Sequence, residues 1–273
     1  MKVVMFTKML KRIGNLTLEE AADCIAKLGF DGADLTVREG GYVNPQNAVT
    51  ELPKAVEVLN SFGLEVPMIT TSITDYSKTS EEIFRVASEC GVQYIKLGYW
   101  TYREFGTFRK LFLEVRGKIR RIYRMSKEYG VTAAVHTHAG NYMTNSAALL
   151  YMLLEGYEPR WVCAYIDPGH LFSETGPYGW ELGLDILSPY IRLLAVKNYR
   201  WVKEKDGDSG VYVWKNKMLP LRCEVVDWPE IFKRLKDIGF DGCVSLHSEY
   251  KEVNLKQLIS QTEDDLKYIR DII

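Results

Sequence analysis

The chain has 273 residues, and its 47% hydrophobic and 26% charged residues are typical of a globular protein with a substantial core. Its 35 basic and 36 acidic side chains nearly balance, so the sequence predicts no overall positive field for binding nucleic acid or an anionic membrane. No segment reaches the ~18 apolar residues of a membrane span, and the five cysteines are scattered without CxxC spacing. We therefore expect a cytoplasmic protein with reduced thiols that binds a small molecule.

Short apolar segments rich in β-branched and aromatic residues recur along the chain and predict strands. They lie at residues 3–7, 32–37, 64–70, 92–98, 131–137, 161–167, 191–197 and 243–248. Amphipathic segments that predict helices lie between strands at residues 18–29, 81–91, 112–130 and 228–239. The first of these helices begins with Thr17 and Glu20 at the spacing of a capping box. Strands and helices therefore alternate along the chain.

This alternation predicts a (β/α)₈ TIM barrel that spans residues 1–273 as a single domain. Eight βα units follow one another without a Pro/Gly/Ser-rich linker, and the sequence has no GxGxxG or Walker motif of the kind that open α/β sheets often carry. The similar segments LGFDGADL (28–35) and IGFDGCVSL (238–246) also indicate a repeated βα unit. Functional side chains of such a barrel lie at the C-terminal ends of its strands. We expect the long loops 38–47 and 198–220 to cover that site.

All four histidines of the chain fall at or just after the ends of predicted strands, whereas chance would scatter them over the helices as well. Side chains alternate along a strand, so His136 and His138 lie on one side of their strand. For the same reason His247 and Glu249 lie on one side of theirs. We interpret these side chains as one site for a ligand or a metal rather than as separate structural histidines.

Residues at other strand ends extend this predicted site. Asp167 precedes His170 by three residues, across a Pro-Gly turn that brings carboxylate and imidazole together. Lys197 ends the seventh predicted strand, where a lysine can contact a carboxylate, phosphate or enolate oxygen, and a salt bridge to Asp167 is the alternative. Further candidates, which surface charge or packing explains equally well, are Lys96, Trp100 and Arg38.

These segments resemble the xylose isomerase-like barrels, a family that includes sugar and sugar-phosphate isomerases, epimerases, some dehydratases and endonuclease IV. The likeness runs nearly from end to end, through GFDGADL, VHTHAG, IDPGH, AVKNY, EVVDWPEIF and GFDGCVSLHSEY in the family's order. The family's usual divalent-metal ligands are Glu, Asp, His and Glu on strands five to eight. At the matching positions this chain has His136, Asp167, Ala195 and His247, so only the aspartate is kept.

The resemblance implies an isomerase or epimerase of a sugar or sugar-like substrate that moves a proton next to a carbonyl with the help of a metal. The predicted ligands of this ion, Mn²⁺, Zn²⁺, Co²⁺ or Mg²⁺, are Asp167, His136, His247 and Glu249. The predicted catalytic residues are Glu249, His136 and His247. The predicted substrate-binding residues are His138, His170, Lys197, Trp100 and Arg38. We also expect Asp167→Ala to cost little stability, because an aspartate at a loop-facing strand end usually serves chemistry.

The sequence leaves two alternatives open: a lyase or dehydratase on the same barrel, and a metal-free sugar-binding protein. Endonuclease IV activity is disfavoured, because that enzyme's trinuclear metal site needs more histidines than the four present and a basic groove that a net charge of −1 does not suggest. The expected partner is a small sugar-like molecule, with neither nucleic acid nor membrane involved. Assembly into a homo-oligomer is left open.

Overall fold

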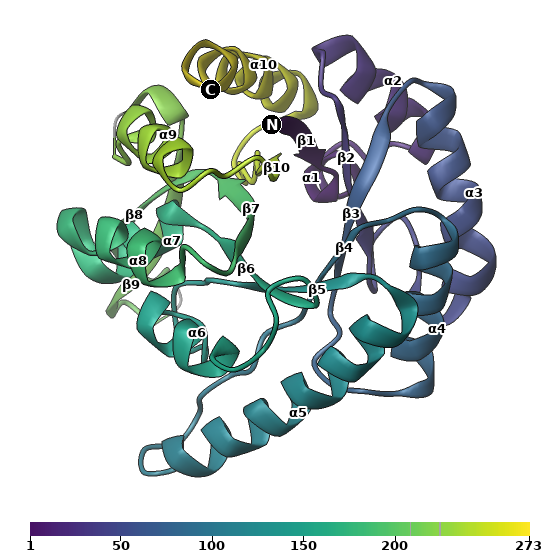
Figure 1. Ribbon diagram of the computed structural model, residues 1–273. Coiled ribbons are helices and arrows are strands. Elements are labelled where there is room, and N and C mark those ends of the chain that lie inside the picture. Colours follow the sequence, from purple (N-terminus) through teal and green to yellow (C-terminus); the bar gives the residue numbers. More distant parts are fainter. Residues whose placement is uncertain (208, 224) are drawn as a thin grey trace.

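Eight parallel strands close into a barrel in the order β1-β10-β7-β6-β5-β4-β3-β2, and helices surround it (Figure 1). This arrangement is seen in a computed structural model that describes residues 1–207, 209–223 and 225–273. The strands are β1 (Lys2–Phe6), β2 (Gly32–Val37), β3 (Glu65–Thr71), β4 (Tyr94–Lys96), β5 (Thr132–His136), β6 (Val162–Ile166), β7 (Ile191–Val196) and β10 (Cys243–Leu246). The predicted (β/α)₈ barrel is confirmed, and each predicted strand segment overlaps one barrel strand.

The outer layer consists of helices that follow or precede the strands along the chain. They are α1 (Lys8–Arg12), α2 (Leu18–Leu28), α3 (Ala48–Ser61), α4 (Lys78–Glu89), α5 (Phe108–Tyr129), α6 (Ala147–Leu154), α7 (Pro168–Thr175), α8 (Gly179–Leu187), α9 (Trp228–Asp237) and α10 (Leu255–Ile272). Short 3₁₀ turns are η1 (Pro45–Asn47), η2 (Gly176–Tyr178) and η3 (Leu221–Cys223). Within the described residues, no helix is both long and apolar enough to cross a membrane.

The capping box predicted at the start of α2 is present, with both of its hydrogen bonds. The Thr17 hydroxyl oxygen accepts a hydrogen bond from the Glu20 amide at 3.2 Å, and the Glu20 carboxylate accepts one from the Thr17 amide at 2.8 Å. Gly29 ends the helix with φ +87°, a conformation that costs a residue without a Cβ little. Local capping therefore fixes where the chain leaves α2 and enters β2.

Hydrophobic side chains form two buried layers. The larger layer lies between the strands and the surrounding helices, and the smaller one fills the barrel interior. The interior layer consists of Val4, Met68, Ala134, Cys163, Tyr165, Leu193, Ala195 and Cys243. Since Ala195 belongs to this packed layer, the seventh strand contributes a methyl group where the family's usual metal histidine would stand. The polar residues beyond this layer, at the strand ends, form the barrel mouth.

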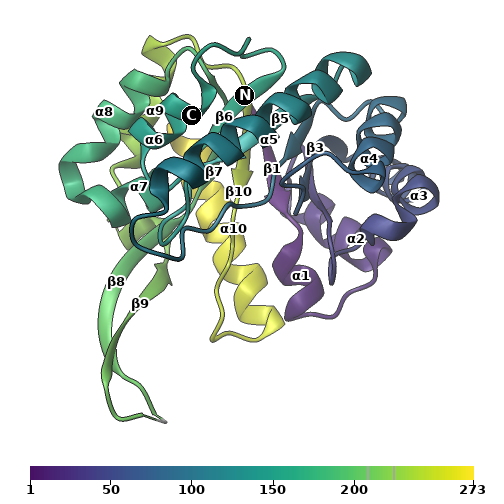
Figure 2. The same ribbon diagram turned by 90° about the horizontal axis from the view of Figure 1, so that it is seen from below.

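The segment after β7 differs from the expected loop. In this segment β8 (Asn198–Lys205) and β9 (Tyr212–Leu219) pair as an antiparallel hairpin, which projects away from the barrel (Figure 2). At its base the Trp201 indole donates to the Ser173 carbonyl of α7 at 2.9 Å. Tyr199 at the start of β8 contacts Glu249 at the mouth, but the far ends of β8 and β9 lie away from the barrel, so the expectation that this segment covers the site as a loop is wrong.

Gly169 allows α7 to pack directly against the end of β7. A Cβ at this position would lie 2.2 Å from the Lys197 carbonyl oxygen, far inside van der Waals contact. We expect Gly169→Ala to lower the free energy of unfolding by about 1–3 kcal/mol, the usual cost of overpacking. Urea unfolding followed by circular dichroism measures it.

The matched control is Gly117→Ala in α5, where the added Cβ would meet only Arg121 Nη1, at 3.9 Å. This helix-interior change should raise stability by up to about 1 kcal/mol, because alanine has the higher helix propensity. Equal effects of the two substitutions would contradict the packing account.

Candidate functional site

Polar side chains from most strands converge on a small cavity of about 80 Å³ at the barrel mouth. It lies beyond the interior hydrophobic layer, where the strands end. Its lining residues are Phe6, Lys8, Arg38, Thr70, Lys96, Tyr99, His136, His138, Tyr165, Lys197, His247 and Glu249. The cavity thus brings together most of the residues that the sequence marked as candidates.

The Lys197 ammonium lies at the centre of the charged groups. Its Nζ is 3.0 Å from Asp167 Oδ2, 3.2 Å from Glu249 Oε2 and 3.3 Å from His247 Nδ1. Burial disfavours the charged amine, but the two carboxylates outweigh it and hold the pKa of Lys197 well above its usual value. The site therefore contains a fixed, buried cation.

Asp167 has two structural contacts besides its ion pair with Lys197. It is the N-cap of α7, where its Oδ1 accepts a hydrogen bond from the His170 amide at 3.0 Å. Its own amide donates to the Thr137 hydroxyl at 2.7 Å. Burial opposes ionisation, yet the neighbouring His170 and Lys197 hold the pKa of Asp167 below its usual value. Asp167 is therefore an ionised side chain with no exposure to solvent.

Glu249 is the carboxylate that lines the cavity, with 11% of its side chain exposed. Its Oε1 pairs with Lys8 and its Oε2 with Lys197. Burial alone would raise the pKa of Glu249, but Lys197, His247 and Lys8 lower it well below its usual value. This carboxylate therefore stays unprotonated, as a general base must.

The imidazoles of His136 and His247 also line the cavity, and burial, aided by the charge of Lys197, lowers the pKa of both, to about 4 for His247. His136 shares a 2.8 Å hydrogen bond with the Tyr99 hydroxyl through Nδ1, and its Nε2 faces Asp167 Oδ2 at 3.2 Å. An ammonium can only donate, so Nδ1 of His247 accepts a hydrogen bond from Lys197. The ring proton of His247 therefore lies on Nε2, which donates to the Tyr165 hydroxyl at 2.8 Å. Both rings are neutral groups at neutral pH.

The remaining histidines lie on the side of the mouth formed after β5 and β6. His138 lines the cavity, and its ring centroid is 3.9 Å from that of His170. His170 stacks in turn on Tyr199 at 5.0 Å and faces Asp167 Oδ2 at 3.6 Å. His170 is 4% exposed and does not line the cavity itself, so it contacts the site through these neighbours.

Trp100 lies apart from the cavity, contrary to its predicted part in substrate binding. Its indole donates to the Thr74 carbonyl at 2.9 Å, and the ring packs in the hydrophobic layer outside the barrel. β4 ends at Lys96, and the turn through Gly98, whose amide donates to the Ile73 carbonyl, carries the chain outward before residue 100 is reached. Arg38, by contrast, lines the cavity as expected.

Sequence reasoning missed several residues that shape the site. Tyr165 lies two residues before Asp167 on the same side of β6, so strand alternation could have found it. Lys8 begins α1 two residues after β1, and nothing in the sequence distinguishes it from other charged residues near strand ends. Asp34 is fully buried next to His247 and accepts hydrogen bonds from the Thr70 and Ser245 hydroxyls, and burial raises its pKa to about 7.

The four predicted metal donors do not fit a divalent ion as they are arranged. Three of them, Asp167, Glu249 and His247, surround the Lys197 ammonium, which lies where a metal ion shared by these donors would have to lie. A dication beside this ammonium would be strongly repelled. Across the described residues, no three His, Cys, Asp or Glu side chains form a cluster able to hold a metal ion. The metal role of these residues stays a prediction that metal analysis must test.

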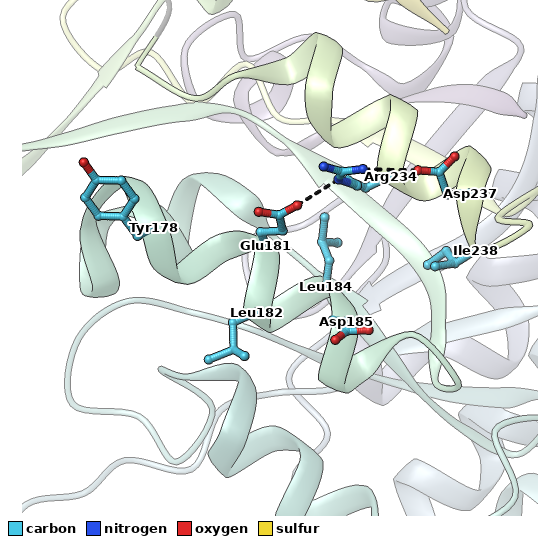
Figure 3. Close-up of a pocket in the computed structure, with 8 residues that line it drawn as sticks. All are labelled: Tyr178, Glu181, Leu182, Leu184, Asp185, Arg234, Asp237 and Ile238. Carbon is cyan, nitrogen blue, oxygen red and sulfur yellow. Dashed lines mark hydrogen bonds and ion pairs between the residues drawn. The ribbon is translucent and has the colours of Figure 1, made fainter.

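A larger surface groove lies elsewhere, between α8 and α9 (Figure 3). Its volume is about 590 Å³, and its walls include the exposed side chains of Tyr178 and Leu182. Arg234 there pairs with Glu181 at 2.9 Å and with Asp237 at 3.5 Å. These charged groups are paired at the solvent-exposed surface, whereas those of the barrel mouth are buried, so the barrel mouth is the candidate site.

The barrel fold agrees with the comparison to known families. Residues 22–272 match the model of the xylose isomerase-like TIM barrel family. The chain belongs to this family. The comparison with curated proteins found no significant match.

Solved structures of other family barrels superpose over almost the whole chain. D-psicose 3-epimerase from Clostridium cellulolyticum has 13% identity and a TM-score of 0.73, covering 100% of this chain and 99% of its own. The probable 3-DHS dehydratase from Bacillus anthracis has 18% identity and a TM-score of 0.74, covering 98% and 99%. A xylose isomerase-like barrel from Mycobacterium smegmatis, in complex with magnesium, has 14% identity and a TM-score of 0.72, covering 99% and 96%. At these identities the likeness shows the fold.

The contacts of Asp167 revise the expectation that its loss leaves stability unchanged. Asp167→Ala removes a helix cap and leaves Lys197 buried with one carboxylate partner instead of two. We expect the free energy of unfolding to fall by about 3–5 kcal/mol, as for other broken buried ion pairs. Chemical denaturation of the purified variant measures this loss.

Asp227→Ala is the matched control, since Asp227 caps α9 in the same way, through the Glu230 amide at 3.1 Å, but is exposed and has no buried cation beside it. Loss of this cap alone should cost about 1 kcal/mol. An Asp167→Ala loss no larger than the control would mean that the buried ion pair contributes nothing to stability.

Proposed function

We propose that the protein is an isomerase or epimerase of a sugar or sugar-like substrate, which it converts by moving a proton on the carbon next to a carbonyl. The observation that carries this proposal is the pairing of Lys197 with Glu249 at 3.2 Å in the cavity wall. A cation and an ionised carboxylate side by side are what enolisation needs, because one group receives the proton while the other stabilises the negative oxygen.

The reaction follows from the positions of these groups. The substrate carbonyl oxygen lies toward the Lys197 ammonium, and Glu249 takes the proton from the adjacent carbon. The electron pair of the C–H bond forms a C=C bond, and the carbonyl oxygen becomes an enediolate oxygen that Lys197 stabilises. Return of the proton by Glu249 to the neighbouring carbon gives the isomer, with a water molecule moving the hydroxyl proton between the two oxygens. The epimer forms when a water molecule on the opposite face gives a proton to the carbon and Glu249 passes its proton back to water. His136 and His247 are neutral imidazoles in the cavity wall. Their ring nitrogens contact Tyr99 and Asp167 in one case and Lys197 and Tyr165 in the other, so both rings orient these groups.

Known structures support this class of reaction. The solved structures of similar fold include a 3-keto-D-glucoside 4-epimerase from E. coli and the D-psicose 3-epimerase described above. The similarity to a probable dehydratase keeps a lyase reaction as the second candidate, since proton removal next to a carbonyl begins both reactions. A sugar-binding protein without catalysis is the third.

Hydrogen exchange separates the three candidates. Purified protein is incubated in D₂O with a panel of ketoses, aldoses and short hydroxy-keto acids, and products are followed by NMR. An isomerase or epimerase incorporates deuterium next to the carbonyl with no loss of water from the carbon skeleton. A dehydratase gives an unsaturated product, and binding without exchange of any panel member indicates the non-catalytic protein.

Glu249→Gln tests the proposed base, because glutamine keeps the shape of the side chain but cannot accept the proton. We expect the exchange rate to fall at least 100-fold, in the range that general-base catalysis provides. Glu252→Gln, a substitution at an exposed position in the same loop, should leave the rate unchanged. Full exchange activity in Glu249→Gln would remove Glu249 from the mechanism.

The metal content of the purified protein tests whether Lys197 takes the place of a metal ion in the reaction. Because its ammonium occupies the position that three predicted metal donors share, we expect exchange activity to persist after treatment with a chelator, and the purified protein to hold no stoichiometric metal. Elemental analysis and the D₂O assay with and without added Mn²⁺, Zn²⁺, Co²⁺ and Mg²⁺ measure both. Stoichiometric metal whose removal abolishes exchange would restore the metal-assisted reaction predicted from the sequence.

A further inference from the structure

The cavity at the barrel mouth has two chemically different sides. On one side, β7 and β10 lead into Lys197 and Glu249, which pair with each other. On the other side, the neighbouring strands β2, β3 and β4 contribute Arg38, Thr70 and Lys96. The proposed reaction uses the first side and assigns nothing to the second.

Lys96 is buried without an anionic partner. Lys96 is the last residue of β4, and its side chain is 3% exposed and lines the cavity. Its Nζ lies over the face of the Tyr99 ring, 3.7 Å from the ring centroid. Among the described residues, none forms a hydrogen bond or an ion pair within 4.0 Å with this ammonium. A buried amine in this position is costly unless an anion joins it, because the aromatic face attracts the charge without neutralising it.

Arg38, which is half-buried on the adjacent wall, also lacks an anionic partner. It directly follows β2, lines the cavity, and its guanidinium lies over the Phe6 ring at 5.6 Å. No carboxylate of the described residues lies within 4.0 Å of it. The two groups also repel each other, since, after burial itself, the charge of Arg38 is the main cause that lowers the pKa of Lys96. Arg38 thus faces the cavity with its charge unbalanced, and an anion beside both groups would favour the charged form of Lys96.

The charged groups around the cavity leave an excess of positive charge on the side formed by β2, β3 and β4. Lys197 pairs with Asp167 and Glu249, and Lys8 pairs with Glu249. The nearby carboxyl group on the other side, Asp34, is bound by two hydroxyl groups and lies within ion-pair distance of neither Arg38 nor Lys96. An anion between Lys96 and Arg38 would offset this excess.

We propose that Lys96 and Arg38 bind an anionic terminal group of the substrate, a carboxylate or a phosphate, while the carbonyl of the same molecule faces Lys197. This inference rests on the function proposed above and names its substrate class. The cavity volume of about 80 Å³ gives room for roughly five to eight water molecules, at ~10–15 Å³ each. The substrate is therefore a short-chain sugar acid or sugar phosphate rather than a neutral hexose.

Three compounds with the same three-carbon skeleton test the anionic subsite without turnover: glycerate, glycerol 3-phosphate and glycerol. Isothermal titration calorimetry should show saturable binding of at least one of the two anions, and binding of glycerol at least ten-fold weaker. The ratio of glycerate to glycerol 3-phosphate affinity assigns carboxylate or phosphate. Equal affinity for glycerol and both anions would overturn the proposal.

Two variants locate the binding to this side of the cavity. Lys96→Met and Arg38→Gln should each weaken binding of the anion at least ten-fold, whereas Lys110→Met, at an exposed position of α5, should not change it. Lys96→Met should also keep or raise the melting temperature, because it replaces a buried unbalanced charge by an apolar chain of similar length. Unchanged anion affinity in both variants, or a Lys96→Met protein that binds normally but melts earlier, would assign Lys96 a structural part instead.

The outcomes for substrate class and for function are separable. Anion binding that depends on Lys96 and Arg38, together with no deuterium exchange for any compound, would support the subsite and overturn the enolisation proposal. Exchange of neutral ketoses at rates unaffected by Lys96→Met and Arg38→Gln would support enolisation and overturn the subsite.

Discussion

The buried ion pairs of Lys197 determine the arrangement of the barrel mouth. This ammonium is 2% exposed and holds Asp167 from β6 and Glu249 from beyond β10, two carboxylates that would otherwise repel each other without water to screen them. Its donated hydrogen bond fixes which nitrogen of His247 carries the proton. The orientation of α7 follows as well, because Asp167 caps that helix and Gly169 brings it against the Lys197 carbonyl.

Aromatic rings keep these charges apart from solvent and so strengthen their interactions. Phe6 stacks on His247 with ring centroids 4.4 Å apart, and Tyr165 stacks on His136 at the same distance. The tyrosine hydroxyls bind the ring nitrogens that face away from the charged centre. The histidines are thereby held as neutral, oriented groups, so the positive charges of the mouth lie on lysine and arginine rather than on imidazole.

Much of the fold could be predicted from the sequence because its signals are local. Apolar strand segments, the Thr17–Glu20 capping box and the glycine at the end of α2 each act within a few residues, and the number of βα units favours a closed barrel. The hairpin at residues 198–220 was missed because its strands are exposed on both sides, so polar and charged residues such as Lys203 and Lys215 hide the strand pattern.

The sequence predicts which residues lie at the site, but not which of them form ion pairs with one another. Strand ends and alternation bring His136, Asp167, His247 and Glu249 to one mouth, and the structure places them there. Which group occupies the centre depends on contacts between residues far apart in the chain, such as Lys197 and Glu249, and no local pattern encodes them. Family resemblance predicted a metal at this centre, whereas the geometry places a lysine there.

The claim that an ammonium takes the central position is tested most directly by a crystal structure of the protein soaked in Mn²⁺, with an anomalous difference map at the manganese edge. The account predicts Lys197 Nζ at its ion-pair distances of 3.0 Å from Asp167 and 3.2 Å from Glu249, with no anomalous peak between these carboxylates. A strong peak bound by Asp167 and Glu249, with Lys197 displaced from them, would contradict it.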